Sequence, residues 1–168
     1  MGMPEGPPAR QDEGYGPTDR ALVEVACTLL KEARSAALAT LMPDGMPFGS
    51  LVSVAMGADG APLMLLSRLA VHTANLERDA RASLLIAAAA ATGNPLADAR
   101  ITLTGTAFPV GNDAAAREAF LARHPEAAAY ADFADFAFFR FRTLGAHMVA
   151  GFGRIGDIPP SELGLPSH

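Results

Sequence analysis

The 168-residue chain lacks the cysteine pairs, histidine clusters and long apolar runs that define several large classes of protein. Cys27 is the only cysteine, so no disulfide framework can form. The four histidines are scattered, with no spacing typical of metal ligands. We therefore expect neither a disulfide nor a metal site.

Basic residues are also few: 13 Lys and Arg stand against 18 Asp and Glu, giving a net charge of -5. No basic cluster of the kind that binds nucleic acid is present. The longest apolar stretches are far shorter than the roughly 20 residues that cross a bilayer. Residues 1–16 have no apolar segment typical of a signal peptide. The sequence predicts a cytoplasmic protein with no nucleic-acid partner and no membrane partner.

Half of the residues are hydrophobic, which is enough for a chain of this length to form the core of one domain. Residues 1–17 contain several prolines and glycines and are expected to form a flexible arm. The folded domain is predicted over residues 18–155. Residues 156–168, again rich in Pro and Gly, are expected to be a C-terminal tail in a loop or against a partner.

Apolar periodicity and turn residues predict the order of helices and strands. A helix capped by Thr18 is followed by a three-stranded meander over residues 36–42, 47–56 and 62–67, with turns at residues 43–45 and 57–60. A short helix lies within residues 67–79. Strands over residues 82–91 and 99–110 come next, with Gly105 as a bulge or close-approach point. A helix capped by Asn112 runs to Arg123, and two strands are predicted over residues 136–142 and 144–152.

Successive antiparallel strands with inserted helices favour an α+β fold over a doubly wound parallel sheet. We expect an antiparallel barrel of six or seven strands with flanking helices.

Residues 151–156 match the G-x-G-x-x-G pattern of dinucleotide-binding proteins. That pattern requires a helix directly after it, whereas Asp157-Ile158-Pro159-Pro160 follows here. The preferred interpretation is a glycine-bearing strand that permits close backbone approach, with Arg154 at its end.

Residues 67–76 gather hydroxyl, guanidinium, imidazole and amide groups at a strand-to-helix junction. Helix N-terminal amides and Arg68 could hold a phosphate, with Ser67 and Thr73 donating hydrogen bonds. The alternative is that Ser67 caps the helix and Arg68 is a solvated surface charge.

Three stretches carry a resemblance to a known family. They are Ala37-Leu38-Ala39-Thr40 through Asp44-Gly45 to Ser50-Leu51-Val52, Leu66-Ser67-Arg68-Leu69 with His72-Thr73 and Asn75-Leu76, and Gly151-Phe152-Gly153-Arg154. The chain resembles the pyridoxamine 5'-phosphate oxidase-like FMN-binding split barrels, closest to their haem-utilisation branch.

The resemblance implies a split β-barrel, a homodimer, and FMN bound at the dimer interface. Its phosphate would be held by Ser67, Arg68, His72, Thr73 and Asn75, and its ring lined by Ser50, Leu51 and Val52. Arg34 and Arg154 are further candidates.

The leading functional hypothesis is an FMN-dependent oxidoreductase acting on a small-molecule substrate. No catalytic residue is assigned, although His147 is a candidate for proton transfer. The first alternative is a haem-binding or haem-degrading protein of the same fold, with His168 as a candidate axial ligand. The second alternative is a cofactor-free structural or interaction module.

Overall fold

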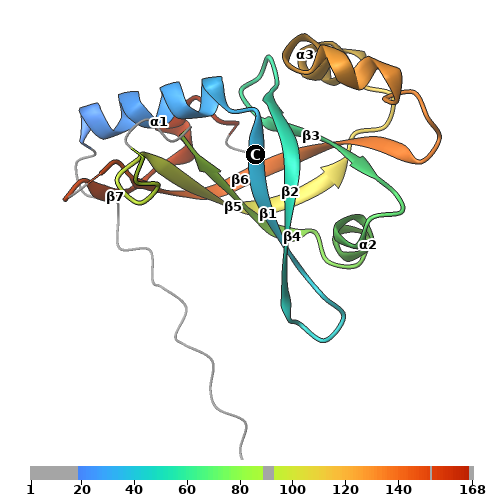
Figure 1. The fold of residues 1–168 in the computed structure, drawn as a ribbon, viewed down its shortest axis with the longest axis horizontal. Coiled ribbons are helices and arrows are strands. Elements are labelled where there is room, and N and C mark those ends of the chain that lie inside the picture. Colours follow the sequence, from blue (N-terminus) through green and yellow to red (C-terminus); the bar gives the residue numbers. More distant parts are fainter. Residues whose placement is uncertain (1–18, 89–92, 152, 167–168) are drawn as a thin grey trace, which may run out of the picture.

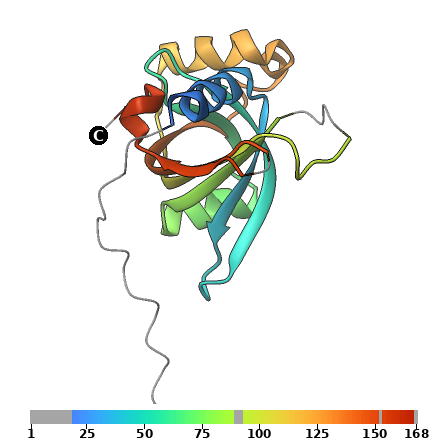
Figure 2. The ribbon, with the colours of Figure 1, turned by 90° about the vertical axis from the view of Figure 1, so that its left-hand side faces the viewer.

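A computed structural model of the chain describes residues 19–88, 93–151 and 153–166. Seven strands of this described part form one antiparallel sheet in the order β3-β2-β1-β4-β5-β6-β7. Their bounds are β1 (Ser35–Leu41), β2 (Pro47–Met56), β3 (Pro62–Ser67), β4 (Arg81–Ala87), β5 (Arg100–Pro109), β6 (Phe136–Val149) and β7 (Ile155–Ile158). A further pairing of β3 with β6 closes the first six strands into a barrel, which Figure 2 shows nearly end-on. The predicted α+β barrel is confirmed.

The β1–β2–β3 meander is built from two tight turns whose residues explain their shape. In the first turn the Asp44 carboxylate accepts a hydrogen bond from the Met46 amide, and Gly45 takes a φ of +83°. In the second turn Asp59 accepts from the Ala61 amide, and Gly60 takes a φ of +85°. Only glycine adopts such angles without steric cost. Both predicted hairpins are confirmed.

The described part of the chain also contains the helices α1 (Arg20–Glu32), α2 (Val71–Arg78) and α3 (Ala114–Arg123). Two short 3₁₀ turns are present as well: η1 (Pro125–Ala129) follows α3, and η2 (Pro160–Leu163) follows β7. Asp19 caps α1, while Thr18 lies outside the described residues. Asp113, not Asn112, caps α3, because its carboxylate reaches the Ala116 amide at 3.0 Å. Ala70 precedes α2 without a side-chain cap, so Ser67 does not cap this helix. No helix within the described ranges is long and apolar enough to span a bilayer.

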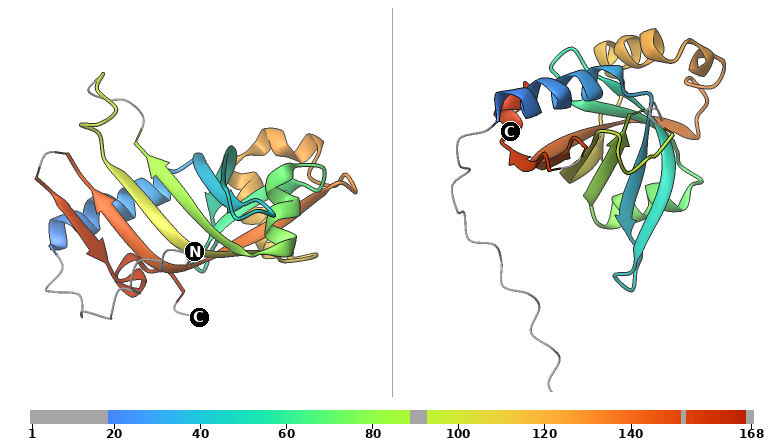
Figure 3. Two further views of the ribbon diagram at one scale, coloured as in Figure 1. Left: turned by 90° about the horizontal axis from the view of Figure 1, so that it is seen from below. Right: turned by 60° about the vertical axis from the view of Figure 1, so that its left-hand side comes forward.

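Two hydrophobic clusters hold the fold together. The larger one fills the barrel and takes in the buried face of α1, which packs against β2, β4, β5 and β7. The second lies outside the sheet, where α3 and η1 cover Leu63 and Leu65 of β3 and Phe138 of β6. Figures 1 and 3 show α1 and α3 near opposite ends of the sheet. A strand is present over residues 136–142 as predicted, but it is not half-buried at its start. Phe138 and Phe139 are both buried, on opposite faces of the sheet.

The end of the chain differs from the sequence prediction. The two strands predicted over residues 136–142 and 144–152 are one continuous strand, β6. Gly151 and Gly153 have φ of +75° and +77°, and they belong to a turn rather than a strand. The segment expected to be a C-terminal tail in a loop or against a partner instead adds β7 to the sheet, and Ile158, Leu163 and Leu165 join the main core. Apolar side chains spaced through this segment drive its packing.

Candidate functional site

The outward face of the sheet from β2 through β1, β4, β5 and β6 to β7 carries a continuous row of paired residues. Each member pairs directly with the next across the strands: Leu51, Ala37, Leu85, Thr102, His147 and Asp157. We call this set the outer row. Leu51 is 80% exposed and Leu85 41%. Exposed apolar side chains gathered on one face commonly mark a ligand or protein contact surface.

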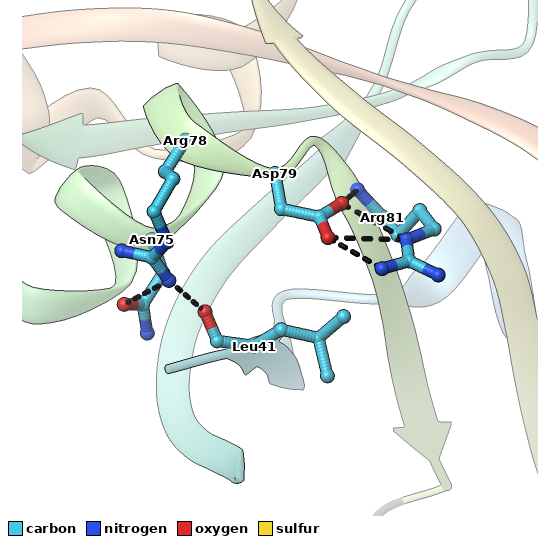
Figure 4. Close-up of polar contacts among 5 residues, drawn as sticks. All are labelled: Leu41, Asn75, Arg78, Asp79 and Arg81. Atoms are coloured by element: carbon cyan, nitrogen blue, oxygen red, sulfur yellow. Dashed lines mark hydrogen bonds and ion pairs between the residues drawn. The ribbon is translucent and has the colours of Figure 1, made fainter. Parts of the chain in front are cut away.

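A shallow depression of about 310 Å³ lies beside the outer row, lined by residues 39–41, Pro47 and residues 81–83. Arg81 stands at its edge in a fixed position, because its Nε and Nη2 bind the Asp79 carboxylate at 3.0 and 2.6 Å (Figure 4). These Arg81 hydrogen bonds lower the pKa of Asp79 to about 2. The depression thus has an apolar floor and a positioned guanidinium.

Arg78, also drawn in Figure 4, ties α2 to the barrel next to this depression. Its guanidinium donates to the Leu41 carbonyl and to the Asn75 side chain. The buried Asn75 amide in turn donates to the Thr40 hydroxyl at 3.0 Å and approaches the Met42 sulfur at 3.6 Å. α2 is therefore anchored by both charged and neutral hydrogen bonds.

His147 and Asp157 form the strongest polar pair on the outer row. His147 Nδ1 lies 2.7 Å from Asp157 Oδ1, and both side chains are about half exposed. Since a carboxylate accepts, we assign the Nδ1 proton to this hydrogen bond, which leaves the Nε2 lone pair available. No second hydrogen bond or ion pair of the His147 side chain is found among the described residues. A carboxylate-oriented imidazole with a free nitrogen is the usual form of a metal-ligating histidine.

A bulge in β6 decides that His147 faces outward. Phe139, Phe141 and Thr143 point into the barrel, so strict alternation would place residue 147 inside as well. The β5–β6 register shifts at Gly105, and Leu144 is the extra residue opposite this shift. Beyond it, Ala146 and Met148 are the buried residues. A bulge re-aims side chains in this way. The prediction that Gly105 marks a bulge or a close approach is confirmed, with the extra residue on β6 and the close approach at Gly105.

The structure brings four of the predicted cofactor residues together in two pairs. His72 Nδ1 lies 3.1 Å from Ser50 Oγ, and the Thr73 hydroxyl donates to the Ser67 carbonyl at 2.6 Å. Ser67 Oγ also accepts from the Leu69 amide at 3.2 Å. The Nε2 atom of His72 is buried and has no hydrogen-bond partner among the described residues. Burial lowers the pKa of His72, so its ring is neutral at pH 7.

The predicted cofactor residues do not all lie at one site. Leu51 points to the opposite face of β2 from Ser50 and Val52, because side chains alternate along a strand. Thr73 and Asn75 are buried and use their donors within the protein. Arg68 lines a different cavity, beside α3, to which none of the other predicted cofactor residues contributes.

The two further candidates form surface ion pairs. Arg34 lies 3.8 Å from Glu126, and Arg154 lies 3.9 Å from Asp19. Sequence reasoning missed Asp157 and Arg81. The short spacing of Asp79 and Arg81 in the sequence could have indicated the Arg81 ion pair. Asp157, in contrast, meets His147 only through the pairing of β6 with β7.

The closed barrel with its extra strand and surrounding helices defines the class of FMN-binding-like split barrels. A protein from Clostridium acetobutylicum related to general stress protein 26, of the pyridoxinephosphate oxidase family, has this fold: the TM-score is 0.66 at 13% identity, over 87% of this chain and 99% of that one. Residues 17–163 match the sequence model of the family described as CREG, beta-barrel. The chain belongs to this CREG β-barrel family, and the resemblance found in its motifs is confirmed.

Two of the proteins to which this chain is similar have names that refer to heme. Over 110 residues, or 64% of this chain, the sequence is 43% identical to the non-canonical heme oxygenase HOZ, chloroplastic, of Arabidopsis thaliana. A heme binding protein from Mycobacterium smegmatis is 35% identical with a TM-score of 0.81, over 88% of this chain. The chain spans 33% of the plant protein and 61% of the mycobacterial one.

Proposed function

We propose that this protein binds haem on its outer face, with His147 as the iron ligand. The observation that carries the proposal is the His147–Asp157 pair, which presents an oriented imidazole on an exposed apolar surface. The names of the plant and mycobacterial relatives support the same cofactor. This reading takes the place of the FMN-dependent oxidoreductase as the leading function.

The residues of the outer face fit the chemistry of haem. Leu51, Leu85 and Leu144 offer apolar surface to a porphyrin ring. Arg81 and Arg142 could pair with the two carboxylates of the cofactor, since guanidinium forks match carboxylate geometry. Arg142 has an exposed side chain on β6 and makes no ion pair within the described ranges. A neutral histidine is a common protein ligand of haem iron.

We extend the proposal to oxidative haem degradation, on the strength of the name of the plant relative. Bound haem would supply the redox chemistry with dioxygen and an electron donor. The chain's own contribution is to hold one His147 tautomer through Asp157 and to keep the ring on an apolar face.

We also propose that the outer face is a homodimer contact with the cofactor at the interface. The exposure of Leu51 and Leu144 on one face supports this proposal, because exposed apolar side chains gathered on a face commonly mark a protein contact surface. Light scattering of wild type and of Leu51→Glu tests it. A wild-type dimer that the charged variant converts to monomer supports the proposal, and a monomeric wild type at micromolar concentration contradicts it.

Haem titration followed at the Soret band tests the main proposal. We expect stoichiometric binding by wild type, a changed Soret position and weaker binding in His147→Ala, and no change in the matched control His72→Ala. His168→Ala tests the C-terminal candidate, which lies outside the described residues. A Soret band that is unchanged in both His147→Ala and His168→Ala would exclude each of these two histidines as the iron ligand.

FMN binding is the second candidate, favoured by the unpartnered Nε2 of His72 beside Ser50. A buried polar atom without a partner is costly, and a ligand oxygen would satisfy it. Saturating FMN should then raise the melting temperature of wild type but not of His72→Leu. If FMN gives neither binding nor stabilisation, this candidate fails. Failure of both titrations would leave the cofactor-free module, and the absorbance spectrum of the freshly purified protein separates the three cases.

A further inference from the structure

A cavity of about 540 Å³ lies between α3, the end of β5 and the first residues of β6, beside the part of the sheet that α3 covers. The elements that form it stand together near one end of the molecule (Figure 3). Its volume falls in the range of small-molecule sites, about 300–1,000 Å³. Neither the haem proposal nor the FMN candidate uses this cavity. Its wall includes Arg68, which the family resemblance had assigned to the FMN phosphate.

The charges in the wall are paired, with one exception. The Arg117 guanidinium holds the Asp132 carboxylate through two contacts of 3.1 and 2.8 Å. Asp113 accepts from Arg140 at 3.2 Å. No ion pair or side-chain hydrogen bond of Arg68 is found within the described ranges, although its backbone amide is fixed to the Asp135 carbonyl at 2.6 Å. The wall therefore presents one unpaired guanidinium, on an exposed residue whose backbone is held in place.

The wall also carries aromatic side chains. Phe133 is 58% exposed, although it is one of the largest apolar side chains in the chain, and Phe136 next to it is half-buried. Phe136 packs against Tyr130, with ring centroids 5.0 Å apart. A flat apolar group entering the cavity would cover Phe133, and an anionic group on it would pair with Arg68.

We infer that this cavity binds a small organic carboxylate with a flat apolar or aromatic body, its carboxylate on Arg68 and its body on Phe133. A cation is disfavoured because both wall carboxylates already have guanidinium partners. The site is separate from the outer row and needs neither haem nor FMN.

Calorimetric titration of the full chain with 2-naphthoate and its neutral analogue 2-naphthamide tests the inference. We expect wild type to bind the carboxylate about tenfold more tightly, as a charge-assisted hydrogen bond implies. In Arg68→Gln the two probes should bind equally. In the matched control Arg20→Gln, an exposed arginine on α1, the preference should remain.

A second variant and a second measurement locate the probe. Phe133→Ala should weaken both probes to a similar extent, and amide NMR shifts on adding 2-naphthoate should cluster on residues 111–117 and 131–138. The inference is overturned if neither probe binds at millimolar concentration, if wild type does not prefer the carboxylate, or if Arg68→Gln keeps the preference. Shifts confined to Leu51 and Leu85 would also overturn it.

Discussion

Replacing Gly105 with alanine tests the close β5–β6 contact that sets the direction of His147. An ideal Cβ at residue 105 would lie 1.9 Å from the Arg142 carbonyl oxygen and 3.0 Å from its carbon. Close C···O contacts in proteins are about 3.3 Å or longer, so the strands must separate by more than about 1 Å. β6 is paired with β3, β5 and β7 and cannot move freely.

We expect Gly105→Ala to lower the free energy of unfolding by about 2–4 kcal/mol. Overpacking contributes about 1–3 kcal/mol, and each weakened ladder hydrogen bond contributes about 0.5–1.5 kcal/mol. Equilibrium urea unfolding followed by circular dichroism measures the change, since the chain has no tryptophan. Haem affinity, measured on the folded variant, should fall in the same direction as in His147→Ala.

Gly49→Ala is the matched control, because Gly49 also lies in a strand but no atom comes within 4 Å of an added Cβ. We expect its stability to change by no more than about 0.5–1 kcal/mol. If the two variants unfold at the same urea concentration, the close contact at Gly105 does not constrain β6 and our account of the bulge is wrong.

Three further predictions concern the outer face and the α3 core. Asp157→Asn should weaken haem binding about 10- to 100-fold with the fold intact, because the amide no longer fixes the His147 tautomer; an unchanged spectroscopic titration would remove Asp157 from the site. The Arg81 hydrogen bonds hold the pKa of Asp79 near 2, so this ion pair stabilises the fold fully above the ordinary carboxyl pKa, and the stabilisation is lost as the pH falls toward 2. NMR titration of Arg81→Gln should show the pKa of Asp79 returning toward its ordinary value. An Asp79 carboxyl that still titrates near 2 in this variant contradicts the assignment. Phe120→Ala should lower the free energy of unfolding by about 3–5 kcal/mol. The control Glu118→Ala, at an exposed residue of α3, should change it by no more than about 0.5 kcal/mol. Equal urea midpoints for the two variants would show that α3 packing contributes little to the stability of the fold.

The family, the barrel and most of the strands could be predicted from the sequence because their signals are local. Turn residues such as Asp44-Gly45 fix a hairpin wherever the strands later pack. A predicted helix cap was wrong by one residue where two candidates are adjacent in the sequence. Asn112 was predicted to cap α3, and Asp113 caps it. The cytoplasmic location stays a prediction.

The candidate site was only partly predictable. Ser50 and His72 were named from motifs and do meet, at 3.1 Å. Leu51 was placed with Ser50 although neighbouring residues of a strand face opposite ways. Arg68 was assigned to the same phosphate site, but it lines the cavity at α3. Adjacency in sequence does not settle which side chains share a cavity.

The sequence alone indicated an antiparallel barrel, because hairpin turns and alternating apolar residues act over a few positions and its motifs resemble those of split barrels. The pairing of β3 with β6, which closes the barrel, joins residues far apart in the sequence. Only the tertiary structure decided that His147 faces outward beside Asp157, since this depends on one extra residue in β6 opposite Gly105. A single-residue shift reverses the direction of every following side chain. Where that shift falls is set by the contact between two strands rather than by either one alone.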